Sequence, residues 1–158
     1  MSIIEKTIRR WIIFFMIMLF LSGLTAIPLE TELDFLSGLF PMGSFIGDWL
    51  DKVQTALHET NRNYPFLLYG YDWLAFAHFI LAVLFIGPLR NPVKNKWVIE
   101  FGMIACVLII PFALIAGYYR GIPFWWRLID CSFGLIGLVP LFICLKKINQ
   151  LEKLNTNN

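Results

Sequence analysis

The chain contains four long runs of apolar residues, and the segments between these runs hold most of its charged side chains. The runs cover about residues 11–29, 66–89, 97–117 and 124–145. A helix needs roughly 20 consecutive apolar residues to cross the hydrocarbon core of a bilayer. The pattern therefore predicts an all-α membrane protein, built as a bundle of four transmembrane helices.

The segment between the first two runs, residues 30–63, is too long for a tight turn. Thr31 and Asp34 are suited to open a short helix that ends before Pro41. From Ser44 onward apolar residues recur at helical spacing, at Phe45, Ile46, Trp49, Leu50, Val53, Ala56 and Leu57. Such a stripe is typical of a helix that lies on a membrane surface. We therefore expect an extracytoplasmic amphipathic helical segment, which either covers the ends of the bundle or offers a docking surface to a partner protein.

The basic residues indicate how the chain is oriented in the membrane. If the N-terminus lies in the cytoplasm, nine of the 13 Lys and Arg residues fall inside and four fall outside. The four outer ones are Lys52, Arg62, Arg120 and Arg127. Short cytoplasmic loops are enriched in Lys and Arg. Both termini are therefore expected in the cytoplasm, with a bacterial inner (plasma) membrane as the location.

Composition agrees with a membrane protein of one domain. Hydrophobic residues make up 58% of the 158 residues, against roughly 45–50% in soluble domains, and the mean hydropathy is +0.69. This length leaves room for a single integral membrane domain, residues 1–158. The sequence carries no phosphate-binding glycine loop and no basic-aromatic pattern of nucleic-acid binding. The expected partners are the lipid bilayer and a membrane protein or a second copy of the chain, and nucleic acid is excluded.

The first apolar run allows a second interpretation, a cleaved signal peptide. Basic residues precede the run, which leads to Leu24, Thr25 and Ala26. Leu24 is large for a position that must be small, and the run is long for a signal-peptide core. We therefore predict an uncleaved first helix.

Small residues in the apolar runs predict close helix packing. Gly102 with Cys106, and Gly134 with Gly137, are spaced so that neighbouring backbones can approach. The other two cysteines, Cys131 and Cys144, also lie in apolar runs without paired spacing. Free buried thiols are therefore expected, rather than a disulfide or metal framework.

A few charged residues lie inside the predicted spans. Asp72 and Asp130 each fall about two turns inside the outer end of a span, and Arg127 precedes Asp130 by three residues. Because an isolated carboxylate is costly to bury, we expect an ion-paired cluster of Asp72, Asp130, Arg127 and Arg120. Such a cluster either fixes the register of the helices or binds a polar or anionic headgroup. Near the inner end of the third span, Glu100 is expected to pair with Lys96 or Arg90.

His78 lies at the centre of the second run, and Tyr71 shares its helix face. One interpretation is a neutral imidazole that bonds to the backbone or a hydroxyl of a neighbouring helix. A second is a proton path or ligand contact, because histidine exchanges protons near neutral pH. A third is haem ligation, but the other histidine, His58, lies in the outer segment. No cofactor and no metal is expected.

The leading hypothesis is a non-catalytic accessory or binding protein. Its site would lie in the outer half of the bundle and take a lipid- or quinone-like ligand or a partner subunit. The candidate residues are His78, Asp72, Asp130, Arg127, Arg120 and Tyr71. Two alternatives stay open: a proton- or ion-coupled transporter that works as an oligomer, and a lipid-modifying enzyme.

Overall fold

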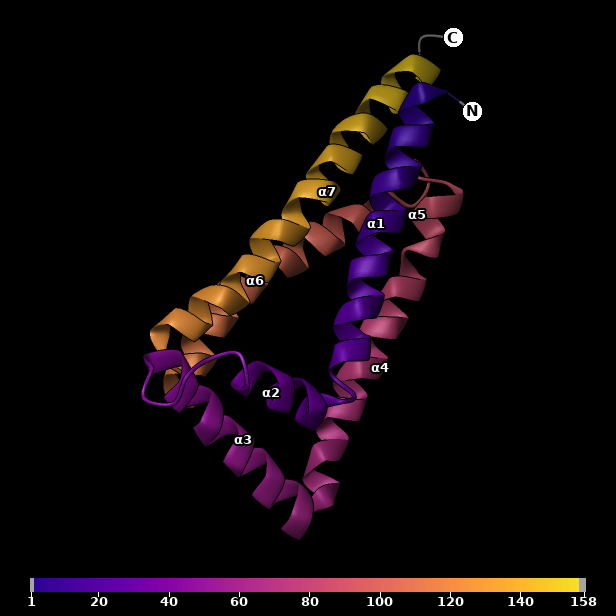
Figure 1. The fold of residues 1–158 in the computed structure, drawn as a ribbon. Helices are drawn as coiled ribbons and strands as arrows, with labels where there is room; N and C mark the ends of the chain where they lie inside the picture. Colours follow the sequence, from indigo (N-terminus) through magenta and orange to yellow (C-terminus); the bar gives the residue numbers. More distant parts are fainter. Residues whose placement is uncertain (1, 157–158) are drawn as a thin grey trace. The chain divides into compact units, whose positions relative to one another are not determined.

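The structure is a computed structural model that describes residues 2–156, and every regular element in this range is helical. The helices are α1 (Ile3–Thr25), α2 (Leu29–Ser37), α3 (Phe45–Asn63), the 3₁₀ helix η1 (Pro65–Leu68), α4 (Tyr69–Leu84), α5 (Ile86–Arg90), α6 (Lys96–Tyr119) and α7 (Phe124–Thr156) (Figure 1). Four segments are long and apolar enough to cross a membrane: Ile3–Thr25, Pro65–Arg90, Lys96–Tyr119 and Phe124–Leu154. The predicted four spans, with a helical segment between the first and the second, are confirmed. The chain is a small polytopic membrane protein.

The helix ends differ from those predicted at both termini. α1 begins at Ile3 rather than near residue 11, and α7 continues past residue 145 to Thr156. The 33 residues of α7 make a helix of roughly 50 Å, whereas the hydrocarbon core is about 30 Å thick. The apolar pattern marks where lipid begins, and a helix does not have to end there.

The second span is not one continuous α-helix. It starts as η1, continues as α4, and is interrupted at Phe85 before the short α5. Pro88 has no N–H to donate to the carbonyl of Leu84, so the regular bonding pattern is broken at this point. The Phe85 N–H instead bonds to the Ala82 oxygen at 3.2 Å.

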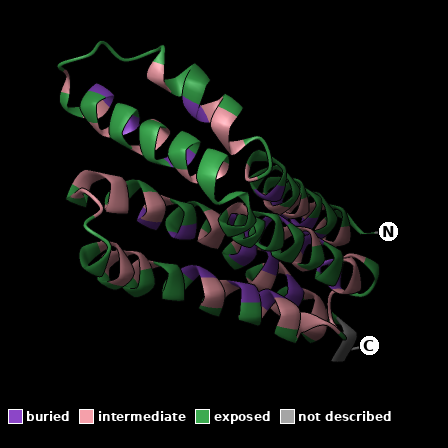
Figure 2. Ribbon diagram, turned by 90° about the horizontal axis from the view of Figure 1, so that it is seen from below, coloured by how far each residue is buried: buried purple, intermediate pink, exposed green. Residues whose placement is uncertain are grey.

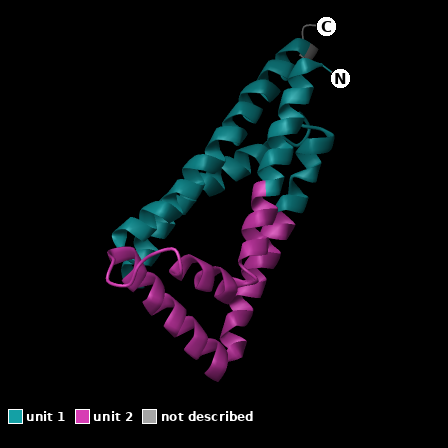
Figure 3. Ribbon diagram, viewed as in Figure 1, with its two compact units in different colours: residues 1–17, 82–158 teal, residues 18–81 magenta. Residues whose placement is uncertain are grey.

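The described chain divides into two compact units (Figure 3). Unit 1 comprises residues 1–17 and 82–158, and unit 2 comprises residues 18–81. Because α1 and α4 each contribute residues to both units, we continue to predict one folding domain.

In unit 1, α6 and α7 form an antiparallel pair that lies side by side along most of its length (Figure 1). A side chain at position 134 would collide with the carbonyl oxygen of Cys106, and one at position 137 would lie 2.8 Å from the Cys106 Sγ. The predicted close helix packing at small residues is therefore confirmed for Gly134, Gly137 and Cys106, and the structure shows that it joins α6 to α7. All three cysteines are free and buried.

The core of unit 1 joins the start of α1 to the end of α7. Ile8, Ile12, Leu141 and Ile148 are all at most 1% exposed, and the Cys144 Sγ lies 3.7 Å from the Ile8 carbonyl oxygen, to which it donates. These two helix ends therefore lie at the same end of unit 1 (Figure 1), as an even number of membrane crossings requires. Residues on the outer faces of the spans are mostly exposed (Figure 2), as expected for helices surrounded by lipid.

The start of α6 is bound to the end of α7 by an ion pair that the sequence did not indicate. The Lys96 Nζ donates to the Glu152 Oε2 at 2.9 Å. Among residues 2–156, Glu100 forms no ion pair, so its expected pairing with Lys96 or Arg90 is wrong. The extra turns of α7 bring Glu152 alongside α6, and this extension was not predicted.

In unit 2, α2 and α3 form a hairpin joined by polar side chains. The Asp34 Oδ1 accepts from the Gln54 Nε2 at 2.6 Å and lies 3.4 Å from the His58 Nε2. One helical turn earlier, the Glu30 Oε2 accepts from the Asn61 Nδ2 at 2.9 Å. The predicted short helix is present and ends before Pro41, but it begins at Leu29, ahead of Thr31, and ends at Ser37.

Candidate functional site

Gly23 brings α1 and α4 together within unit 2. A Cβ added at this position would lie 2.8 Å from the Ala75 carbonyl oxygen and 2.9 Å from the His78 Cβ. A larger residue therefore cannot occupy the position unless the helices separate. One turn earlier on α1, the rings of Phe20 and Phe79 pack with centroids 5.0 Å apart. Gly23 was not among the predicted packing residues, although a glycine inside an apolar span is typical of a close helix contact.

His78 lies at this contact and is half-buried. Its Nδ1 is 2.8 Å from the carbonyl oxygen of Leu74, on its own helix. Because a carbonyl only accepts, the bond requires the proton on Nδ1 and leaves Nε2 as the acceptor of a neutral ring. The expected bond to a neighbouring helix is thus replaced by one to the preceding turn of α4.

A cleft of about 690 Å³ opens in unit 2 where α1 ends and the second span begins. Its polar wall includes Glu30, Asn61, Tyr71 and Asp72, contributed by α2, α3 and α4. The Glu30–Asn61 hydrogen bond lies in this wall. Two of the predicted site residues, Tyr71 and Asp72, therefore line the same open cleft.

Other residues that line the cleft are apolar. They belong to the α1–α2 connection, to α3 and to η1, and include Ile27, Leu57, Phe66 and Leu68. Leu57 is buried, and Phe66 is mostly exposed. The cleft therefore combines a polar and an apolar wall at the end of two spans.

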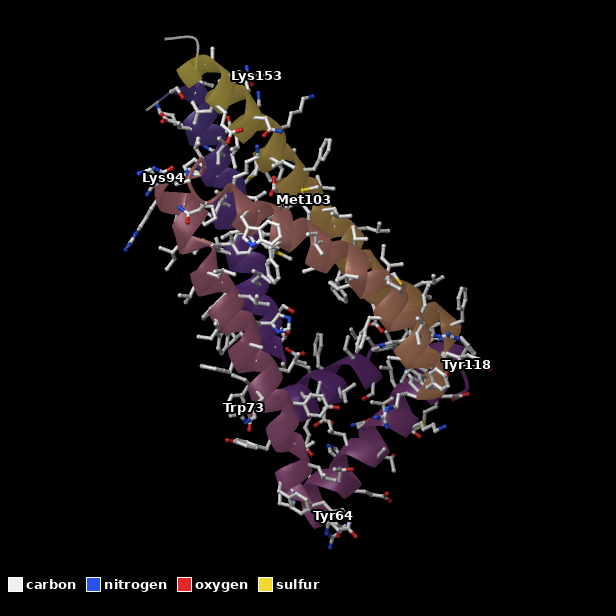
Figure 4. The ribbon with its side chains drawn as sticks, turned by 180° about the vertical axis from the view of Figure 1, so that it is seen from behind. Tyr64, Trp73, Lys94, Met103, Tyr118 and Lys153 are labelled. Carbon is white, nitrogen blue, oxygen red and sulfur yellow. The ribbon has the colours of Figure 1, made fainter. Side chains whose placement is uncertain are left out.

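Asp72 borders a second, smaller hollow of about 250 Å³ that is lined by Tyr69, Trp73 and Phe76. The Trp73 ring packs edge-on against Tyr69 and Phe76, with centroids 6.0 Å and 5.7 Å away. Figure 4 shows Trp73 projecting from α4 on the side away from α2. Tryptophan and tyrosine are enriched where helices leave the hydrocarbon core. This aromatic group is therefore consistent with Asp72 lying at headgroup level.

Asp72 lies in the first turn of α4, where the helix dipole favours a negative charge. Its side chain is exposed, and none of the hydrogen bonds and ion pairs among residues 2–156 includes it. His78 lies further along α4, and no described hydrogen bond connects the two.

Arg127 and Asp130 belong to unit 1 and do not form the predicted ion pair. Within the described range the ion pairs are His58–Asp34 and Lys96–Glu152. The Arg127 Nη1 instead donates to the Leu114 carbonyl oxygen at 3.2 Å, and its guanidinium lies 5.3 Å from the Phe124 ring centroid. The Arg127 stem also packs over Gly117, where any side chain would collide with it. Arg127 therefore contacts a backbone carbonyl and an aromatic ring, and not the predicted carboxylate of Asp130.

The other members of the predicted cluster lie apart from this contact. Asp130 is half-buried on α7, and Arg120 is exposed at the C-terminal end of α6. Asp72 belongs to unit 2. The four residues therefore do not form a network of ion pairs within either unit.

Glu30 and Asn61 are the site residues that sequence reasoning missed. They are 31 positions apart on different helices, and only the α2–α3 hairpin brings them together. The helical spacing of apolar residues on α3 fixed which face of that helix is buried, but it did not indicate which residue of α2 lies opposite.

Among residues 2–156, no three His, Cys, Asp or Glu side chains converge in a way that would hold a metal ion. No known protein family, no curated protein and no solved structure matches this chain.

Proposed function

We propose that this chain is a non-catalytic binding protein that holds an amphiphilic, lipid- or quinone-like molecule in the cleft of unit 2. The observation that supports this most strongly is the position of the cleft. It lies at the ends of the spans Ile3–Thr25 and Pro65–Arg90, which the distribution of basic residues assigns to the extracytoplasmic side.

The size and the apolar wall of the cleft suit such a ligand. Pockets for small molecules usually measure about 300–1,000 Å³ and are lined mainly by apolar groups with a few polar ones; the cleft measures about 690 Å³. Ile27, Leu57 and Phe66 provide apolar surface for a hydrocarbon chain.

The polar wall favours a particular kind of headgroup. Glu30 and Asp72 provide carboxylate oxygens, and no Lys or Arg lines the cleft. Carboxylates accept hydrogen bonds and attract positive charge. A headgroup with ammonium or hydroxyl donors therefore fits better than one with a free anionic group.

A cleft-filling substitution tests the proposal. Thr31 is exposed and lines the cleft, so Thr31→Trp should fill part of it without disturbing the core. The protein is purified from membranes in mild detergent, and the retained amphiphiles are extracted and measured by mass spectrometry. We expect a species retained by the wild type to fall by about tenfold in Thr31→Trp.

Thr55→Trp is the matched control, because Thr55 is exposed on α3 and lies outside the cleft. The polar wall is tested in the same way with Asp72→Asn against Asp51→Asn, whose carboxylate is exposed on α3. If the retained amphiphiles are the same in Thr31→Trp and Thr55→Trp, the cleft is not the binding site.

His78 supports a second candidate function, proton-coupled transport by an oligomer. Its half-buried ring uses Nδ1 in the bond to Leu74, and no described hydrogen bond uses Nε2. Proton flux into proteoliposomes should then be lost in His78→Gln and kept in His58→Gln. Equal flux in His78→Gln and the wild type would eliminate this candidate.

A further inference from the structure

A small hollow lies in unit 1 between the start of α1 and the segment around α5. It measures about 100 Å³ and is lined by Glu5, Ile8, Arg9, Pro88, Leu89, Arg90 and Pro92. Its volume corresponds to about three water molecules. It can therefore hold one compact polar group, but not a whole lipid or cofactor.

The floor of the hollow is rigid and apolar. Ile8 and Pro88 are both less than 2% exposed, so neither is free to move into the space. Pro88 also causes the break before α5, which turns the chain so that Arg90 ends the second span beside α1. The helix break caused by Pro88 therefore shapes the hollow.

Two arginine residues from different helices line this hollow. Arg9 is on α1 and Arg90 is the last residue of α5. Among residues 2–156, neither has a hydrogen-bond or ion-pair partner. The third charged residue, Glu5, accepts a hydrogen bond from the Ser2 backbone N–H at 2.6 Å.

Arg9 and Arg90 bring two positive charges to the hollow against the single negative charge of Glu5, so the lining carries a net positive charge that attracts an anion. The guanidinium group is planar and matches the oxygens of a phosphate with paired hydrogen bonds. Arg90 ends a membrane span, so the hollow lies at the depth of lipid headgroups. Basic pockets between spans on the cytoplasmic side are suited to anionic headgroups, and the positive-inside assignment places this end in the cytoplasm.

We infer that Arg9 and Arg90 together bind one phosphate group at this hollow. The phosphate belongs either to an anionic phospholipid of the cytoplasmic leaflet or to free phosphate in the cytoplasm. The site is independent of the cleft in unit 2, and it shares no residue with it.

The test uses the purified full chain and native mass spectrometry. Phosphatidylglycerol is titrated against the wild type, Arg9→Gln and Arg90→Gln, with diacylglycerol of the same acyl chains as the uncharged comparison. We expect each of the two variants to bind phosphatidylglycerol about tenfold more weakly, with diacylglycerol binding unchanged.

Arg10→Gln is the matched control, because Arg10 has the same charge, neighbours Arg9, is exposed and does not line the hollow. It should weaken binding by no more than about twofold. Equal losses in all three variants would show a diffuse charge effect and overturn the inference, as would no loss in any of them.

Arg9→Lys and Arg90→Lys test the geometry of the site. These variants keep the charge but lose the paired hydrogen bonds of the guanidinium group, so partial binding is expected even if a glutamine variant fails to fold.

A competition experiment distinguishes the two sources of the phosphate group. Inorganic phosphate at millimolar concentration is added to the complex of the wild-type protein with phosphatidylglycerol. Displacement of the lipid supports free phosphate as a ligand, and arginine-dependent binding without displacement supports the lipid headgroup.

Discussion

Gly23 of α1 lies directly against His78 of α4, so that a Cβ at position 23 would be 2.9 Å from the His78 Cβ. Because glycine has no side chain, α1 and α4 can approach each other closely at this position. The same contact places His78 where α1 packs against α4.

Gly23→Leu should destabilise the protein by about 1–3 kcal/mol, because the helices must separate to accommodate the larger residue. The measurement is unfolding in detergent, followed by circular dichroism or thermal shift. Gly70→Ala is the control, since a Cβ at Gly70 of α4 meets nothing within 4 Å. An unchanged stability in Gly23→Leu would show that the close approach is absent.

The ion pair between Lys96 and Glu152 should contribute about 0.2–1 kcal/mol, as partly exposed pairs do. A double-mutant cycle of Lys96→Gln and Glu152→Gln measures this coupling, which should decrease at high salt because ions screen it. The same cycle with Glu100→Gln in place of Glu152→Gln should give no coupling. If Lys96 couples to Glu100 instead, α7 does not reach α6 in the way described.

Asp34→Ala should loosen the α2–α3 hairpin. The change removes the acceptor of the 2.6 Å bond from Gln54 and the partner of His58, at a cost of about 1 kcal/mol. Amide hydrogen exchange in residues 29–63 should then accelerate about fivefold. Asp51→Ala, on the exposed side of α3, should leave the exchange rates unchanged, and similar acceleration in both variants would count against the specific contact.

Both termini should lie in the cytoplasm, as the distribution of basic residues predicts. A reporter enzyme that is active only outside the cytoplasm should be inactive when fused after residue 158 and active when fused after Met42. A fluorescent protein that folds only in the cytoplasm should give the opposite result. Activity of the first reporter at residue 158 would reverse the orientation or change the number of crossings.

The first helix should remain attached to the mature protein. Ile8, Ile12 and Phe15 of α1 are buried in unit 1, so cleavage after Ala26 would remove part of that core. Peptide mapping by mass spectrometry of protein purified from membranes should therefore recover peptides from residues 3–25. A sequence that begins at Ile27 would mean that the first run is a signal peptide.

The sequence alone determined how many times the chain crosses the membrane, because lipid demands long apolar runs whose number and position can be counted directly. It also identified the small residues Gly134 and Gly137, since close packing of membrane helices depends on the size of the residue itself. Tyr71 and Asp72, which line the cleft, also stand out in the sequence, because they are polar groups near the end of an apolar span.

Only the tertiary structure decided the partners of these residues. Asp72 shares a cleft with Glu30 and Asn61, and Lys96 pairs with Glu152, because the turn after α2 and the extra length of α7 bring distant positions together. Arg127 binds a carbonyl and lies over a ring rather than pairing with Asp130, three residues further along α7. Helical spacing gives the face on which a side chain lies, but its partner is set by the neighbouring helix that packs against that face.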